Sequence, residues 1–566
     1  MLKIEVEKKL ATYLSLGAFF VTVFLLTNTN TDPVNVTKLF ALGAVSMAVF
    51  AISIFFGSKV LFSNFKSLLI LIAIFNLAMI VSTVSSRAPY SQNYFGAYGR
   101  NSGLLTYLLL SAVLISSLLL TKVESFERVI YGLFAAGLLN ILYCAWVLAF
   151  GDFIPWANPY GAILGLLGNP DFASAFLGMV IASSLSYIAA AGTPRILRLI
   201  LSIASAVALY EIVKSHAIQG LIVTAGGFAV VGFYFIRSRV KQKFFTYAYS
   251  AALLFVGAIA IFGTLQKGPL SFVYKRSVSF RGTYWRSGIE MGNSHPFTGV
   301  GMDTYGDWYR RVRPPVALID TPGIHTMSNV SHNVVIDFFA SGGYPLLLSY
   351  LGIIAFGAIS IIKITKRKAE YDRVFVALTT SWLGYEVQSF ISINQIGLVI
   401  WGWLLTGLLV AYERSTRDSS SGESSGKQKE GKRAARKQEP FISPQLISGI
   451  GAVIGILISI PPFSADAKWF SATRSHDAAK VEVALTPSYF APADSTRYAQ
   501  AVALFQTSNL QDLAYKYAVI AVKFNPDYFD AWKQLYFLPK ASEAEKASAL
   551  SNMKRLDPKN PDVTAN

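Results

Sequence analysis

Charged residues are scarce in this chain. Asp, Glu, Lys and Arg account for only 14% of its 566 residues, whereas hydrophobic residues account for 53%, and the mean hydropathy is +0.45. Soluble domains usually carry roughly 25% charged residues, so this composition excludes an ordinary soluble protein and indicates a membrane protein. Cysteine is nearly absent as well. The single Cys144 lies inside an apolar segment, which excludes a disulfide framework or a thiolate metal site within one chain.

The motifs of several large function classes are also missing. No Gly-rich phosphate loop of the Walker type occurs, which argues against an ATP-driven pump. No HExxH occurs, and the few acidic residues of the longest polar interval form no cluster, so we expect neither a metal nor any other cofactor. The apolar segments hold almost no acid beyond Glu211 and Glu386, which argues against an ion-coupled transporter.

Basic residues, by contrast, are in excess. The chain has 50 Lys and Arg against 32 Asp and Glu, which gives a formal net charge of +18. Nucleic-acid binding is one reading of such a charge. In a polytopic membrane protein, however, Lys and Arg gather in the cytoplasmic loops. We therefore assign the excess to membrane topology and expect no nucleic-acid partner.

Long apolar segments fill most of the chain. A membrane-spanning helix needs about 20 mainly apolar residues, and about thirteen segments meet that requirement. They lie near residues 10–28, 36–57, 67–85, 103–121, 127–150, 171–192, 196–213, 217–236, 246–264, 344–362, 373–391, 395–412 and 444–463. The predicted fold class is an all-α polytopic membrane protein with about 12 or 13 transmembrane helices.

The distribution of basic residues predicts the orientation of these spans. With the N-terminus in the cytoplasm, the inner loops receive most of the Lys and Arg, in agreement with the positive-inside rule. The few basic residues of the short outer loops are Lys38, Arg87, Arg100 and Lys214. The long interval 265–343 and the tail 464–566 are then expected outside the cytoplasmic membrane.

The longest polar interval lies within Phe280–Pro345, and we expect it to be functional, because a long charged loop between helices is more often a site than a spacer. It holds three of the five histidines and a group of arginines. These arginines are Arg281, Arg286, Arg310, Arg311 and Arg313. Arg offers phosphate oxygens a fork of donors at any working pH, so the expected ligand is a lipid diphosphate. The alternative is a solvated basic loop that contacts anionic lipids. Arg281 and Arg286 are predicted to lie in one helix, over 280–292, without necessarily sharing a face.

The end of this interval, SHNVVIDFFASGGYP, contains the candidate base. Ser331 is expected to cap a helix that runs to Ser341, after which two glycines and a proline end it before the next span. His332 would then lie at the helix start, beside the headgroup layer, where it could take a proton from a sugar hydroxyl. The alternative is a histidine that only hydrogen-bonds loop backbone.

Two segments with soluble character come near the C-terminus. The stretch 413–442 is Ser/Gly-rich and then strongly basic, and it is predicted to be a disordered cytoplasmic linker. Its basic residues either touch anionic lipid headgroups or have no partner. A last span at 443–463 leads to the tail 464–566.

The tail is predicted to be helical and to resemble tetratricopeptide repeats. Two apolar-periodic stretches end in Asn525-Pro526 and Asp557-Pro558, about 32 residues apart, which is near that repeat's period. Such a tail would either dock an acceptor or partner or form a small helical cap.

Several segments of the chain resemble the O-antigen ligase and polymerase superfamily. Within the long interval, HPFTGVGMDTY at 295–305 and SHNVVIDFFASGGYPLLLSYLGI at 331–353 are similar to its signature region. There an Arg-containing helix precedes a P-x-x-G-x-G turn, and H-N opens the helix that leads to the next span. Further resemblances are DPVNVTKLFALGAV, GAYGRNSGLLTYLLL, GLLGNPDFASAFLGMV and QSFISINQIGLVIWGWLLTGLL, so that the likeness covers roughly residues 30–412.

The resemblance implies a GT-C-like, metal-independent, inverting glycosyltransferase. Such an enzyme moves a glycan from an undecaprenyl diphosphate carrier to an acceptor outside the cytoplasmic membrane. Arg281 and Arg286 match positions expected to face the donor diphosphate, and His332 matches the residue expected to activate the acceptor hydroxyl. Gly299 and Gly301 match the glycines that shape the turn.

Further candidates for substrate binding follow from the same resemblance and from the arginine-rich interval. They are Arg100, Asn169, Arg310, Arg311 and Asn333. One departure stands after the seventh span, where many members carry S-R-G and this chain carries KSHAIQGL. Lys214 or His216 either supplies the missing charge, or that contribution is absent.

The function predicted first is an O-antigen ligase-like transferase. A polysaccharide polymerase and a protein O-oligosaccharyltransferase of the same superfamily use the same chemistry and remain alternatives. The acceptor is accordingly a glycolipid, a glycan or a protein, and the bilayer is the other partner. From other classes, a polysaccharide or lipid transporter and a membrane scaffold organised by the tail remain.

Overall fold

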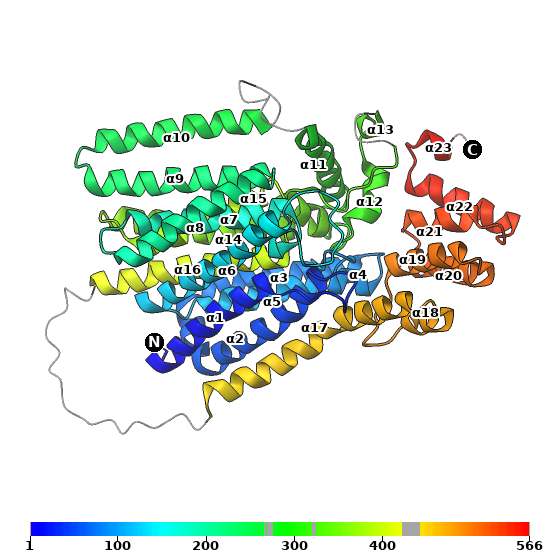
Figure 1. Cartoon of the computed structure of the whole chain (residues 1–566), viewed down its shortest axis with the longest axis horizontal. Coiled ribbons are helices and arrows are strands. Elements are labelled where there is room, and N and C mark those ends of the chain that lie inside the picture. The colour runs from blue at the N-terminus through cyan, green and yellow to red at the C-terminus, as the bar shows by residue number, and fades with distance from the viewer. Residues whose placement is uncertain (1, 265–267, 269–275, 320–323, 422–441, 565–566) are drawn as a thin grey trace.

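The computed structural model describes residues 2–264, 268, 276–319, 324–421 and 442–564. About three quarters of this described chain is helical (76%), and the described residues contain no strand. Figure 1 shows long helices that run side by side, with the C-terminal helices gathered at one end of the bundle. The predicted all-α polytopic fold is therefore confirmed.

Each of the thirteen predicted spans coincides with a helix. These helices are α1 (Ile4–Val23), α2 (Asn35–Asn64), α3 (Lys66–Ser85), α5 (Leu104–Ser117), α6 (Val123–Phe150), α7 (Pro170–Ala189), α8 (Arg195–Lys214), α9 (Ile218–Arg239), α10 (Lys243–Thr264), α14 (Val334–Arg367), α15 (Arg373–Ser389), α16 (Ile396–Ser421) and α17 (Pro444–Arg474). Within the described residues, nine helices are long and apolar enough to cross a membrane, and α5 and α10 contain shorter apolar helices.

Several expected boundaries differ from the structure, and two of these differences concern the C-terminal part of the chain. The helix α16 continues to Ser421, past the position 413 where the linker was expected, and 422–441 lie outside the described residues. The last span continues ten residues or so beyond 463 before α17 ends at Arg474. The C-terminal helices therefore begin as a direct extension of the last span.

The prediction that Lys38 lies in an outer loop is wrong. Lys38 belongs to the first turns of α2, and its side chain is wholly buried. Its ammonium group donates hydrogen bonds to the carbonyl oxygens of Val21 (3.3 Å), Thr22 and Phe24 (3.1 Å). These carbonyls end α1, where the helix offers unpaired acceptors and the negative end of its dipole. The lysine thus has a local partner and marks no loop.

The last span packs against the second, although they are about 400 residues apart in the chain. Gly43 of α2 lies so close to α17 that a Cβ there would come within 2.6 Å of the Gly455 carbonyl oxygen. Small residues let two backbones approach in this way within a bilayer. At the centre of the bundle, the apolar part of α16 is entirely buried, and Trp401 donates a hydrogen bond to Thr22 Oγ1 at 2.8 Å.

The C-terminal domain consists of short antiparallel helices with their own apolar core. They are α18 (Ala478–Leu485), α19 (Ser495–Thr507), α20 (Gln511–Phe524), α21 (Phe529–Phe537), α22 (Glu543–Leu556) and α23 (Pro561–Thr564). The first helices of the two hairpins, α19 and α21, begin 34 residues apart. The tetratricopeptide resemblance stays a prediction, and the helical hairpins themselves are present.

The helices of the long polar interval lie at the same end of the bundle as the C-terminal domain (Figure 1). They are α11 (Arg276–Ser294), α12 (Tyr305–Val312) and α13 (Val316–Ile319), and the short α4 (Tyr90–Phe95) lies beside α12. The predicted helix over 280–292 lies within α11. A single 3-10 turn, η1 (Gly165–Leu167), precedes α7.

Candidate functional site

A kink in α14 provides the base of the site. Gly343 has non-helical dihedral angles (φ 64°, ψ −159°), and Pro345 follows two residues later. Pro345 has no N–H to donate to the Ser341 carbonyl, and the Tyr344 N–H bonds Pro296 O at 2.7 Å instead of closing the helix. The carbonyls of Ala340 and Ser341 are therefore available to partners from outside the helix.

The turn after Pro296 uses those carbonyls. Val300 N donates to Ala340 O at 2.9 Å, and Gly301 N donates to Ser341 O at 3.1 Å. Gly299 (φ 62°) approaches α14 so closely that a Cβ would lie 2.1 Å from the Ser341 carbonyl carbon. Only glycine fits a left-handed position at such a distance, which is the physical reason for this residue in the turn.

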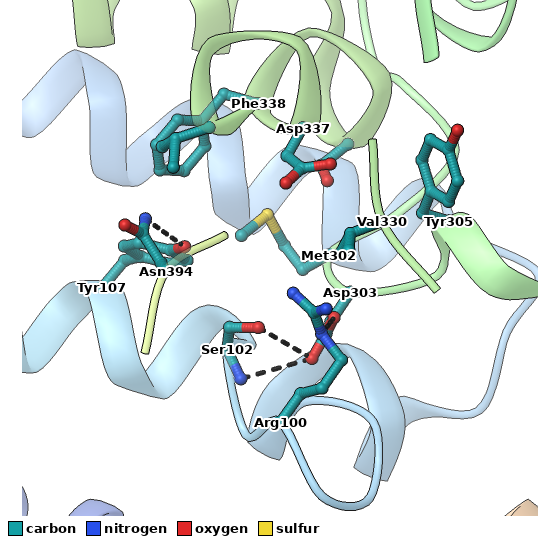
Figure 2. A pocket seen from close by; sticks show the side chains of 12 residues that line it. Arg100, Ser102, Tyr107, Met302, Asp303, Tyr305, Val330, Asp337, Phe338 and Asn394 are labelled. Atoms are coloured by element: carbon teal, nitrogen blue, oxygen red, sulfur yellow. Dashed lines mark hydrogen bonds and ion pairs between the residues drawn. The ribbon is translucent and has the colours of Figure 1, made fainter. Parts of the chain in front are cut away.

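The turn presents Asp303 to the loop before α5. Asp303 Oδ2 accepts hydrogen bonds from Ala97 N (2.8 Å), Ser102 N (3.2 Å) and Ser102 Oγ (3.1 Å). Its other oxygen lies 3.3 Å from Arg100 Nε, and both side chains are largely buried (Figure 2). Charge-assisted bonds of this kind are strong and directional, so Asp303 fixes the position of the Arg100 guanidinium.

A small cavity of about 30 Å³ lies beside this ion pair, with room for about one water molecule. Asp337 of α14 and Arg100 face it, as Figure 2 shows. On the far side Asn394 Nδ2 donates to the Tyr107 hydroxyl at 3.0 Å. The cavity thus joins the loop before α5, the glycine turn, the start of α14 and the loop before α16.

His332 lies at the entrance to α14 in a left-handed conformation (φ 58°). Its ring stacks on Tyr284 of α11, with 5.6 Å between the ring centroids. Within the described residues neither ring nitrogen forms a hydrogen bond, so no loop backbone contact occupies them. Left-handed non-glycine residues are costly and often mark functional positions.

The expected cap of this helix is wrong by two residues. Asn333, not Ser331, is the N-cap: its Oδ1 accepts from the N–H groups of Val335 (3.0 Å) and Ile336 (3.2 Å). Its Nδ2 donates to Phe390 O at 3.0 Å. Asn333 therefore fixes the helix start and its neighbour His332, and its polar atoms already have protein partners.

Two arginines lie close enough to His332 to change its protonation. Burial first, and then the positive charges of Arg281 and Arg100, lower the pKa of His332 from its ordinary 6.5 to about 3. The imidazole is therefore neutral at physiological pH. These two arginines and the histidine, which the sequence predicted separately, come together in space.

Arg281 is also close to the N-terminus of α7. Burial lowers the pKa of Arg281, and the Asp171 carboxylate opposes this shift. Asp171 is held at the helix start by Asn169, the N-cap residue, whose Oδ1 accepts from Asp171 N at 2.8 Å. The side-chain nitrogen of Asn169, Nδ2, donates to the Tyr160 hydroxyl at 3.0 Å. The structure thus gives Asn169 a role in setting the surroundings of Arg281.

The remaining candidates before Arg310 have different positions. Arg286 is exposed on α11, whereas Arg281 is half-buried. Lys214 ends α8, with its ammonium 5.5 Å from the centre of the Tyr210 ring. His216 is exposed and left-handed (φ 56°). Lys214 and His216 are not among the charges that shift the pKa of His332.

Arg310 and Arg311 were expected to bind substrate, but the structure pairs them with the C-terminal domain. Arg310 Nη1 lies 3.3 Å from Asp557 Oδ2, and Arg311 Nη2 lies 2.8 Å from Asp527 Oδ1. Arg313, which is wholly buried, donates to both oxygens of Asp557 at 2.7 Å. Because these guanidinium groups already face carboxylates, a donor diphosphate would have to displace the tail to reach them.

Other contacts hold the tail against the same region. Asn525 Nδ2 lies 3.3 Å from Asp307 Oδ2, and burial raises the pKa of Asp307 to about 6. In α17, Asp466 accepts from the Tyr98 hydroxyl at 3.0 Å and lies 3.6 Å from Arg497 of α19. The C-terminal domain is therefore docked on α12 and the loop before α5, both of which border the cavity.

Two acids of the site escaped the sequence analysis. Asp303 lies two residues after Gly301, and this position directly after the glycine turn is the feature of the sequence that could have identified it. Asp337 is the only charged residue in the apolar run after His332, which marks it as a side chain with a special environment. Its Oδ1 accepts from Ser331 N at 2.7 Å and so braces the loop that carries His332.

Comparison with known families supports this location. The family model described as O-antigen ligase matches residues 203–351, from within α8 to within α14. The matched region includes Arg281, Asp303 and His332, and it confirms the resemblance noted in the sequence. Arg100, Asn169 and the C-terminal domain lie outside the match. No curated protein matches the chain.

Proposed function

From the O-antigen ligase match over residues 203–351, we propose that this membrane glycosyltransferase moves a glycan from an undecaprenyl diphosphate carrier to a hydroxyl acceptor. The reaction takes place at the outer face of the cytoplasmic membrane, with the N-terminus inside. The observation that carries the proposal is the convergence of Arg100, Arg281 and a neutral His332 at one end of the bundle.

The arginines stabilise the leaving group. In the donor, the glycosidic bond to the diphosphate breaks, and negative charge develops on the departing diphosphate. Arg281 and Arg100 are preorganised cations at that point, Arg100 because Asp303 holds it at 3.3 Å. Groups fixed in advance stabilise a developing charge without a reorganisation cost. Arg286 is exposed on the same helix as Arg281 and extends the positive surface along the carrier.

His332 acts as the general base. The acceptor hydroxyl attacks the anomeric carbon from the face opposite the diphosphate and gives its proton to a ring nitrogen, so the configuration inverts. In the free enzyme, burial and the two nearby arginines lower the pKa of His332 and keep the imidazole neutral. When the donor binds, its diphosphate offsets the arginine charges, so the pKa of His332 rises and the ring becomes a stronger base.

The chemistry requires no metal ion, because cationic side chains supply the electrostatic stabilisation. Among the described residues no group of three His, Cys, Asp or Glu gathers in a way that could hold one. Transfer is therefore expected to continue in the presence of a chelator.

The same chemistry allows three reactions that differ only in the acceptor: a glycolipid, a growing glycan or a protein. We favour ligation to a glycolipid over polymerisation, because the C-terminal domain is docked on Arg310, Arg311 and Arg313, and a chain-extending enzyme has less need of such a docking domain. A protein hydroxyl is the acceptor in the third variant of the same chemistry.

The test is transfer in reconstituted membranes, with purified protein, a polyprenyl diphosphate-linked glycan, candidate acceptors and excess chelator. Wild type is expected to label one acceptor, and His332→Ala is expected to lose roughly 10²- to 10⁴-fold in rate, the usual contribution of a general base. His476→Ala is the control: His476 is left-handed like His332, but it is exposed and lies near the C-terminal domain, away from the candidate site. Full transfer by His332→Ala would refute the base role. Carrier movement across the bilayer without transfer would favour a transporter.

A further inference from the structure

A second, larger cavity opens at the other end of the bundle. Its volume is about 470 Å³, and its walls come from the α2–α3 junction, the last turns of α14 and the end of α16. From Tyr344, directly after the kink, to Lys363 is 19 residues, or roughly 29 Å of helix. The hydrocarbon core of a bilayer is about 30 Å thick. The cavity therefore lies at the level of the opposite headgroup layer.

The lining of this cavity is strongly basic. Four of its side chains are cationic, namely Lys66, Lys363, Arg414 and Arg417, and only one is acidic. That acid, Glu413, is already paired with Arg367 at 2.7 Å. In the part of the chain that the structure describes, neither Lys66 nor Lys363 forms an ion pair, and both are exposed. The cavity thus presents positive charge to an anionic ligand.

The same cavity has an apolar flank that continues into the lipid-facing surface. Phe356 and Ile359 of α14 line it, and Ile359 is 47% exposed. Ile362 and Phe62 next to it are 52% and 64% exposed. Such residues at the end of a span contact acyl chains. A ligand that fits must therefore join an anionic head to an apolar tail.

Polar donors stand between the lysines and the apolar flank. The side chains of Asn64 and Ser67 line the cavity, with the Asn64 oxygen accepting from Arg414 at 2.8 Å, and the first turn of α3 has no side-chain cap. Its N–H groups point outward from the helix start, which carries a partial positive charge. These groups add hydrogen bonds suited to phosphate oxygens and do so beside the charges of Lys66 and Lys363.

We propose that this cavity binds the phosphate-containing headgroup of an anionic phospholipid, with its acyl chains along Ile359. The occupant is a bilayer lipid, not free phosphate, because the cavity opens between spans at headgroup level and is partly apolar. Basic pockets between spans bind such headgroups. The cavity contains none of the residues proposed for transfer, so the lipid-binding proposal can be tested independently of the proposed function.

The experiment measures lipid binding by the full-length protein in detergent, by native mass spectrometry and by the thermal unfolding midpoint. The probes are phosphatidylglycerol, phosphatidylcholine and inorganic phosphate. Wild type is expected to retain phosphatidylglycerol selectively and to gain stability from it. Lys66→Gln/Lys363→Gln should weaken that binding roughly tenfold or more, as expected for two basic groups at an anionic surface. Inorganic phosphate should leave both readouts unchanged.

Two variants make the result decisive. Lys59→Gln/Lys366→Gln removes the same charge at the same end of α2 and α14 but outside the cavity, and it should bind lipid like wild type. Lys66→Arg/Lys363→Arg should retain binding and shows that the position tolerates change. Equal weakening in the two glutamine variants, equal binding of the two lipids, or full competition by inorganic phosphate would each overturn the proposal.

Discussion

The polar interval contains two groups of arginines that differ in what faces them. Arg281, with Arg100 from the loop before α5, lies near a neutral histidine, and Arg100 also lines a small cavity. Arg310, Arg311 and Arg313 face carboxylates that come from more than 200 residues further along the chain. The residue type is the same, and the difference lies in where the facing carboxylates come from. Arg100 pairs with Asp303 beside the cavity, whereas the other three arginines pair with the C-terminal domain. An arginine-rich loop therefore indicates anion binding without telling whether the anion is a ligand or the protein itself.

The two groups also differ in the consequence of removing a side chain. Arg281 is half-buried, and no ion pair of its guanidinium is found among the described residues, so its removal should cost little folding stability. A wholly buried arginine such as Arg313 leaves Asp557 as a buried, partly uncompensated charge, which is strongly destabilising. Activity and stability should therefore separate cleanly between the groups.

Between the two groups of arginines, the largest expected effect is on transfer by Arg281→Ala. Loss of one preorganised charge at the leaving group should lower kcat roughly 10²- to 10³-fold, while the unfolding midpoint and the protection of the tail from hydrogen exchange stay at wild-type values. Arg87→Ala, an exposed arginine at the same end of the bundle, is the control. A wild-type kcat for Arg281→Ala would break the distinction between the two groups.

Next in size is the effect of Arg313→Ala on tail docking. Removal of one partner of a buried pair typically costs about 3–5 kcal/mol, so α20 to α22 should exchange faster and the chain after α17 should become sensitive to protease. Arg555→Ala removes a half-exposed partner of Asp527 and should cost about 1 kcal/mol or less. Unchanged protection in Arg313→Ala, or a kcat loss as large as that of Arg281→Ala with the tail still docked, would contradict this assignment.

A smaller effect tests how Arg100 is positioned. In Asp303→Asn the amide can accept on one side only, so its NH₂ group must face either Arg100 or the N–H groups of Ala97 and Ser102. Misplacement of the guanidinium should raise the donor KM and lower kcat/KM roughly 10- to 100-fold. Asp307→Asn, four residues on, contacts Asn525 of the tail and should keep near wild-type kinetics. Equal behaviour of the two variants would show that Asp303 does not position Arg100.

The smallest effect is in the pH dependence. Because burial, Arg281 and Arg100 hold the pKa of His332 near 3, the free enzyme keeps its base neutral well below pH 6. The acid limb of kcat/KM should therefore lie far below the ordinary histidine range, and that of kcat should lie higher, since bound diphosphate offsets the arginines. Arg100→Ala should move the free-enzyme limb upward. A limb of kcat/KM near pH 6.5 in wild type would contradict a depressed pKa.

The sequence anticipated much of the site because its residues sit in local patterns. Arg281, His332 and Arg100 lie in segments that resemble one family. Arg281 lies in the expected helix, and His332 lies directly before the helix that it was expected to begin. Asp303 and Asp337 were missed because their importance depends on partners from other elements: Arg100 in one case and Ser331 in the other. The cap at Asn333 was misplaced because Ser and Asn two residues apart offer similar side-chain acceptors, and only the backbone geometry selects one.

By itself, the sequence determined the thirteen helices and the bundle's membrane character, because span length and apolarity are properties of a continuous segment. It also located the polar interval and its candidate base. Only the tertiary structure decided which arginines remain available, since Asp527 and Asp557 reach the loop through the docked tail. It likewise decided the protonation state of His332 and the fate of Lys38, because burial and the nearest charges depend on elements far apart in the chain.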